Sequence, residues 1–287
     1  MTPAPTAPLP AGIVAPRSAW RSLLWIVPLT AAWIAVIYWQ PIVPTSGVQT
    51  TTHQLLAHAA IAIGMWLGVE RCDLAPGQRR ATWFAVMIPY TLWFAIAWSA
   101  AIHGTFRADE SPSSLPLLPL AIILPVLIGT PILLLSNRLG QVLDAMPANW
   151  LVALQIYRIF GGWALAAWLH GGLPGAFAVP AGIGDVLTGV LAVPAAIAVA
   201  SGTAKGRRAA MLWNIVGLAD FAVAITMGMI TSPGRLQLIV PDVPSIGMGA
   251  YPDVLTPAFV VPCSILLHML SLRQLSRLNK RNRHTVR

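Results

Sequence analysis

Seven polar or ionisable side chains interrupt long apolar stretches in the second half of the chain. They are Gln155, Arg158, His170, Asp185, Asn214, Asp220 and His268. A charged side chain inside a lipid bilayer is costly, so such residues usually pair with one another or line the route of an ion or solute. These seven residues are therefore the candidate ligand or ion path.

Two of these residues carry opposite charges at matching depths. Counting about 1.5 Å per residue from the ends of the predicted helices places Arg158 and Asp220 near the middle of their spans. Pairing removes most of the cost of burying either charge alone. We therefore predict an ion pair between Arg158 and Asp220.

The other polar residues fall at different depths by the same count. Asp185 is predicted near the outer surface, where His170 is close enough to share a hydrogen bond with it. Asn214 and His268 are predicted in the inner third of the bundle. The result is a polar ladder, which suits a proton or solute path, although structural pairing within a bundle predicts the same residues.

The segment that contains Arg158 has a ligand-binding and a packing interpretation. Gln155 and Arg158 lie three residues apart, so they share a helix face and are expected to hold an anionic or carbonyl ligand together. Gly161 and Gly162 allow another helix to approach closely. The next helix offers three similar small surfaces, at Gly182, Gly184 and Gly189. We predict that these two helices pack together.

Signatures of metal or cofactor chemistry are weak. The sequence contains no H-E-x-x-H, no C-x-x-C and no Gly-rich phosphate loop. His58, His170 and His268 differ too much in predicted depth to form one tetrahedral zinc site. Haem ligation by His58 and His170 is disfavoured, because a lone histidine on an apolar helix is more often structural. We predict no metal site, no cofactor, no assigned catalytic residue, and free thiols at Cys72 and Cys263.

Membrane-spanning helices must position these side chains. Apolar residues make up 56% of the 287-residue chain and charged residues only 9%, far below the roughly 25% of a soluble domain. A helix needs about 20 mostly apolar residues to cross a bilayer. Eight segments qualify, at residues 20–39, 51–69, 82–103, 115–136, 150–169, 179–200, 209–230 and 254–272. The predicted fold is all-α, a polytopic integral membrane protein with about eight transmembrane helices.

Basic residues predict the orientation of these helices. Of the 18 Lys and Arg residues, fifteen fall in segments on one side, Arg107 and Arg235 fall in loops on the other side, and Arg158 lies within a span. Cytoplasmic loops are the ones enriched in Lys and Arg, so both termini are predicted to be cytoplasmic. This pattern excludes nucleic acid as the partner, because anionic lipid headgroups explain basic loop edges and a basic tail.

Three parts of the chain follow from this topology. Residues 1–18, rich in Pro and Ala, are predicted to be a disordered cytoplasmic tail. Residues 19–272 form the membrane domain, with its polar half at 150–272, and residues 273–287 form a basic cytoplasmic tail. The outer loops at 40–50, 104–114 and 231–253 are long and contain Pro and Gly. They are expected to be either plain connectors or a lid over an external opening.

Three classes of function remain open. The preferred one is a small-solute or proton-coupled transporter in the plasma (inner) membrane, with Asp185 or Asp220 as the titrating group. The second is a sensory or accessory membrane protein whose polar cluster is structural. The third is an intramembrane enzyme that acts on a lipidic substrate. The partners expected from sequence are the lipid bilayer and, at the basic tail, anionic lipid headgroups.

Overall fold

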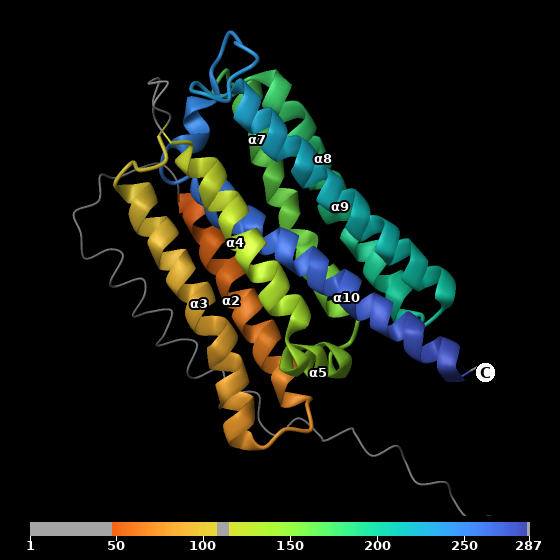
Figure 1. Cartoon of the computed structure of the whole chain (residues 1–287). Coiled ribbons are helices and arrows are strands. Elements are labelled where there is room, and N and C mark those ends of the chain that lie inside the picture. Colours follow the sequence, from red (N-terminus) through yellow and green to blue (C-terminus); the bar gives the residue numbers. More distant parts are fainter. Residues whose placement is uncertain (1–47, 108–114, 286–287) are drawn as a thin grey trace, which may run out of the picture.

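The computed structural model describes residues 48–107 and 115–285, and every regular element in these ranges is a helix (Figure 1). The elements are α2 (Val48–Glu70), α3 (Pro76–Ile102), α4 (Leu117–Leu135), α5 (Asn137–Ala145), α6 (Asn149–Leu154), η1 (Gln155–Gly162), α7 (Trp163–Leu169), α8 (Gly175–Ala200), α9 (Ala204–Thr231), η2 (Ser245–Gly249), η3 (Thr256–Val260) and α10 (Val261–Thr285). The predicted all-α class is confirmed for this part of the chain.

Six helices in the described ranges are long and apolar enough to cross a membrane. They are Pro76–Ile102, Leu117–Leu135, Asn149–Leu169, Gly175–Ala200, Ala204–Thr231 and Thr256–Lys280. Each corresponds to one of the predicted spans. The weakly apolar second span is also helical, as α2, but is not among these six. The predicted first span at 20–39 and the tail at 1–18 lie outside the described residues.

Helix α10 crosses the bundle between two groups of helices (Figure 1). Helices α8 and α9 pack along each other, and the α6–η1–α7 segment packs on α8. Helix α10 contacts α4, α9, α6 and α5, so it touches both halves of the molecule. The segments 103–107 and 232–255 lie at one end of the bundle, and α5 lies at the other end (Figure 1).

The outer surface of the bundle is apolar. On α4 the side chains of Leu127, Ile132 and Leu135 are 65%, 63% and 79% exposed, and on α8 Ile197 is 67% exposed. Soluble monomers rarely expose apolar surface on this scale, whereas lipid tails solvate it. The apolar helices and this surface define a helical membrane protein.

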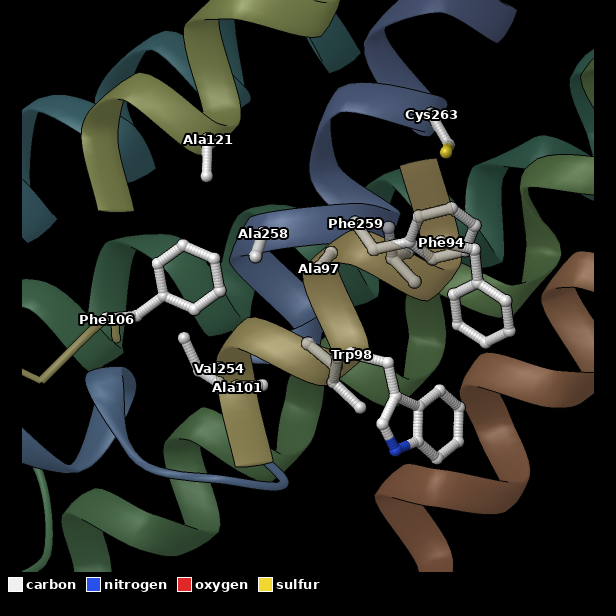
Figure 2. Close-up of a cluster of buried hydrophobic side chains, with 12 residues drawn as sticks. Phe94, Ala97, Trp98, Ala101, Phe106, Ala121, Val254, Ala258, Phe259 and Cys263 are labelled. Carbon is white, nitrogen blue, oxygen red and sulfur yellow. The ribbon is translucent and has the colours of Figure 1, made fainter. Parts of the chain in front are cut away.

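The interior between α3 and η3, the segment just before α10, is packed with aromatic rings and small residues (Figure 2). Phe94 and Phe259 lie with ring centroids 4.3 Å apart, and Phe94 meets Trp98 edge-on at 5.0 Å. Alanines such as Ala97 and Ala258 are fully buried beside them. Small residues let the helix backbones approach closely, which is the usual way that helices associate in a membrane.

A short amphipathic helix, α5, closes the end of the bundle opposite to the long loops, and the sequence analysis did not foresee it. The side chain of Gln274 on α10 donates to the carbonyls of Leu143 and Met146, which satisfies the end of α5. Arg277 pairs with Asp144. The segment predicted as a basic tail therefore begins as a continuation of α10, which extends to Thr285.

Candidate functional site

The segment that carries Arg158 is a break in a membrane helix. The sequence predicts one helix at 150–169, but the chain forms α6, then eight residues of 3₁₀ helix in η1, then α7. Runs of 3₁₀ helix longer than three or four residues are uncommon and often mark a hinge or strain. Eight residues extend about 16 Å in this form, against about 12 Å in an α-helix.

Close contact with α8 explains where the break occurs. A Cβ added to Gly189 on α8 would lie 2.6 Å from the backbone nitrogen of Ile159, and one added to Gly182 would lie 2.6 Å from Cγ of Leu165. A Cβ on Gly161 would overlap the carboxylate of Asp185. The predicted glycine-mediated packing of these two helices is therefore confirmed.

Arg158 is the centre of the site, with its side chain 2% exposed. Its guanidinium forms ion pairs with Asp220 on α9 and, at 2.7 Å, with Asp185 on α8. The guanidinium carbon also lies 3.8 Å from the ring centroid of Phe221. The predicted pair of Arg158 and Asp220 is present, and Asp185 is a second partner that the sequence analysis placed elsewhere.

All three nitrogens of the Arg158 guanidinium have partners within the protein. A guanidinium carries five N–H groups and no acceptor. Nε donates to Asp185 at 2.8 Å, and Nη1 donates to the carbonyl of Gly217 at 3.3 Å and to His268 at 3.1 Å. Nη2 donates to Asp220 and lies within ion-pair distance of Asp185. Every nitrogen of Arg158 is therefore already engaged within the protein.

Gln155 and Arg158 bond to different partners in the bundle. Both side chains face α10, but the Gln155 amide donates to the backbone carbonyl of Ser264 at 3.0 Å. Gln155 is fully buried, and its neighbour Tyr157 bonds the Ser264 hydroxyl at 2.6 Å. Contacts between helices engage the Gln155 amide nitrogen and the Arg158 guanidinium in this structure, and a ligand shared by the two residues stays a prediction.

The hydrogen bonds of His268 define its protonation state. Arg158 has only donors, so Nε2 of His268 must be the acceptor of their 3.1 Å bond. Nδ1 then carries the proton and donates to Oδ1 of Asn214 at 2.9 Å. The Asn214 amide donates in turn to the carbonyl of Ala210 and to Ser271 at 3.0 Å. His268 is therefore neutral while Arg158 holds this position.

Five of the six residues of the predicted ladder form one connected cluster, and His170 lies outside it. Asp185 lies ten residues into α8, because this helix begins at Gly175 and not at the predicted residue 179. That deeper position lets Asp185 reach Arg158. His170 stays at the exposed end of α7, where its ring bonds the carbonyl of Ala166 at 2.7 Å. The predicted hydrogen bond between His170 and Asp185 is not formed.

A cavity of about 340 Å³ reaches Asp185 from the end of the bundle that carries the long loops. Its deep wall includes Gly161, Phe221 and Asp185, and its rim includes Arg107 and Arg235. The Asp185 side chain is 23% exposed, against 11% for Asp220. Asp185 is thus the member of the cluster that faces the open space.

Several cavity residues were missed by the sequence analysis. The aromatic side chains of Trp163, Phe177 and Phe221 line the wall, and the 3₁₀ turn η2 in the loop at 231–253 lines the upper part. This loop is one of the three outer loops that were expected to be either plain connectors or a lid. No signal in one sequence distinguishes a cavity-lining aromatic residue from one that packs in the core or faces lipid.

The first half of the bundle holds a separate buried polar group. His58 on α2 stacks against Tyr90 and Phe94 at 4.8 and 4.9 Å, and its Nε2 lies 3.5 Å from the hydroxyl of Thr91. Gln54 bonds Thr256 at 3.2 Å. Within residues 48–107 and 115–285, no three His, Cys, Asp or Glu residues gather closely enough to hold a metal ion.

Both cysteines are free thiols, as predicted, and both are buried. Cys72 lies in the turn between α2 and α3, where its thiol contacts the carbonyl of Gly68 at 3.5 Å. Burial raises the pKa of the Cys72 thiol, although the nearby Arg79 acts in the opposite direction. This thiol is therefore a weak nucleophile at neutral pH.

The site thus belongs to an all-helical membrane protein with a buried Arg–Asp cluster beside a cavity. The chain belongs to the family described as a domain of unknown function (DUF8737), whose model matches residues 115–276, more than half of the 287 residues. The matched range contains all seven candidate residues and the whole Arg158 cluster. No curated protein and no solved structure matches the chain.

Proposed function

We propose that the protein spans the plasma membrane eight times, with both termini in the cytoplasm. The fifteen basic residues that fall on one side of the predicted topology support this orientation. The cavity then opens to the outside, and α5 and the basic end of α10 lie at the cytoplasmic surface, where anionic headgroups attract Lys and Arg.

In this membrane the protein transports a small solute, with coupling to protons, along the polar path of its last four helices. The observation that carries the proposal is that Asp185 belongs to two features at once. It lines the cavity, and it is an ion-pair partner of the buried Arg158. An occupant of the cavity therefore acts directly on the charges at the middle of the bundle.

The hydrogen-bond chain below the cavity supplies a route toward the other side. It runs from Asp185 through Arg158, His268 and Asn214 to Ser271. In many transporters the substrate site is formed by broken membrane helices. The 3₁₀ segment η1 is such a break.

Proton coupling has a physical basis in the surroundings of Asp185. The groups that face it are Arg158 from η1 and Asp220 from α9, while His268 from α10 acts through Arg158. Arg158 pairs with two carboxylates at once, so protonation of one carboxylate leaves the arginine neutralised by the other. Loading of a proton then removes the net charge of the cluster, and release of the proton restores one excess negative charge.

The test uses the purified full chain in liposomes that contain a pH-sensitive dye. A panel of small amines, carboxylates and sugars is added outside, and solute-driven movement of protons is recorded. Asp185→Asn is expected to abolish the response. Asp242→Asn is the matched control, because it removes the same charge from an exposed loop position and should leave the response unchanged.

The polar groups of the cluster bond to one another, and this favours one competing function, a sensory or accessory membrane protein with a structural polar core. In that case Asp185→Asn and the control would give identical vesicle signals, and Asp185→Asn would differ only in a lower midpoint of thermal unfolding. Measuring both quantities on the same preparations separates the two functions.

A further inference from the structure

The buried cluster carries one negative charge in excess. It contains one arginine and two aspartates, joined by ion pairs. His268 adds no charge, because its Nε2 accepts a hydrogen bond from Arg158. An uncompensated charge at this depth is costly, and a positive ligand removes that cost.

The accessible part of this negative charge lies on Asp185. Both of its contacts with Arg158 use Oδ1, and within the described ranges Oδ2 takes part in no hydrogen bond. The side chain is 23% exposed and lines the cavity, whereas Arg158 is 2% exposed. A ligand in the cavity therefore meets a carboxylate oxygen before it meets the guanidinium.

The wall around this carboxylate suits an organic cation better than a metal ion. Trp163, Phe177 and Phe221 line the cavity with it. Aromatic faces attract cations, and an apolar wall favours ligands with carbon groups. A hard metal ion needs several oxygen ligands, and Asp185 is the single carboxylate among the described lining residues.

From these observations we infer that the cavity binds a monovalent organic ammonium compound, with its ammonium group on Oδ2 of Asp185 and its apolar part against the aromatic wall. This inference rests on the proposed function, since it names the class of solute that the site accepts. It also explains the coupling, because a proton and the ammonium group compete for the same carboxylate.

The two other charged residues that line the described part of the cavity allow a test of the sign of the ligand's charge. Arg107 and Arg235 are exposed at the rim, and both repel an approaching cation. Replacing both with glutamine should strengthen binding of an ammonium compound by about twofold to fivefold at low salt, and the gain should vanish in high salt. An anionic solute would respond in the opposite direction.

The experiment measures binding to the purified full chain in detergent by calorimetry, with three probes built on one ring. The probes are 2-phenylethylammonium, 2-phenylethanol and phenylacetate. We expect the ammonium compound to bind at least about tenfold more tightly than the other two, which corresponds to about 1.4 kcal/mol. Asp185→Asn should remove this preference, and the exposed Asp242→Asn should keep it.

The double variant Arg107→Gln/Arg235→Gln, called the rim variant, still tests the inference if Asp185→Asn fails to fold, because Arg107 and Arg235 lie outside the buried cluster. Tighter ammonium binding in Arg107→Gln/Arg235→Gln supports the inference. Preference for phenylacetate, equal binding of all three probes, or weaker ammonium binding in the rim variant overturns it. Vesicle transport is measured separately. Ammonium binding that depends on Asp185, without transport, refutes only the transport function. Transport that depends on Asp185, with a preference for phenylacetate, refutes only the solute class.

Discussion

At the scale of single residues, the main feature of the site is that one arginine forms ion pairs with two carboxylates from different helices. A buried ion pair contributes little net stability, but removal of one partner leaves a bare charge and typically destabilises by about 3–5 kcal/mol. Arg158 is the single cation of the cluster, and Asp185 and Asp220 are its partners. Loss of the arginine should therefore be the most damaging change in the site.

The first prediction compares a single variant with a charge-free triple variant. Arg158→Gln should lower the free energy of unfolding by about 3–5 kcal/mol, because two carboxylates remain buried without a cation. Arg158→Gln/Asp185→Asn/Asp220→Asn should recover part of this loss, since no charge remains. Thermal unfolding in detergent measures both. Equal loss in the two variants would show that packing and not charge determines the effect.

A charge swap between Arg158 and Asp220 is a poorer test of the same pair. A Cβ on Gly184 would overlap the Asp220 carboxylate, so α8 leaves no room for an arginine at position 220. Failure of the swapped protein would reflect overpacking. Neutralising substitutions change the charge without adding volume.

The sequence predicted one of the two ion pairs of this cluster, Arg158 with Asp220, and missed the pair of Arg158 with Asp185. Arg158 and Asp220 were paired correctly because both lie far from the ends of their helices, where an error of a few residues does not matter. Asp185 was placed too close to the surface because four residues at the start of α8, from Gly175, were left out of the predicted span. His170 was included because polar residues at helix ends resemble site residues until their neighbours are known.

At the scale of elements, the sequence predicts helices well and their internal form poorly. Apolar runs identified every long helix of the described ranges, since a bilayer requires such runs. The 3₁₀ form of η1 went unseen, because hydrophobic composition is the same for a 3₁₀ and an α-helix. Helix α5 was missed because its nine residues are too few to span a bilayer.

The second prediction tests whether contact with α8 maintains η1. Gly189→Ala should destabilise the protein by about 1–3 kcal/mol, because the new Cβ meets the backbone of Ile159, which has no freedom to rotate away. Gly64→Ala on α2 is the matched control. It has open space around its Cβ position, so the higher helix propensity of alanine should leave stability unchanged or raised by up to about 1 kcal/mol.

Thermal unfolding of both alanine variants measures the contrast, and solute-driven proton movement in vesicles adds a functional readout for Gly189→Ala. A normal unfolding midpoint in this variant would mean that α8 and η1 separate at little cost. The close approach would then not be the reason for the break in the helix.

At the scale of the whole molecule, the buried charges and the proposed site lie in one half of the bundle. The Arg158 cluster, the broken helix and the carboxylate of the cavity all belong to the segment from α6 to α10, and α2 and α3 contribute aromatic and small-residue packing. The orientation of this bundle decides which side of the membrane the cavity faces, so topology is the property on which the functional proposals depend most.

The last prediction concerns that orientation and uses cysteine labelling in a background without the native thiols, Cys72→Ser/Cys263→Ala. Lys205 is exposed at the start of α9, and Arg235 is exposed in the loop that follows α9. A membrane-impermeant maleimide added to intact cells should label Arg235→Cys and leave Lys205→Cys unlabelled. The two variants are matched, since each removes one basic residue. Thr2→Cys and Lys280→Cys should behave like Lys205→Cys, because an even number of spans places both ends inside.

Labelling of Thr2→Cys alone would mean an odd number of spans. Labelling of Lys205→Cys in place of Arg235→Cys would mean that the bundle has the opposite orientation in the membrane. In that reversed case the cavity, and Asp185 within it, would face the cytoplasm.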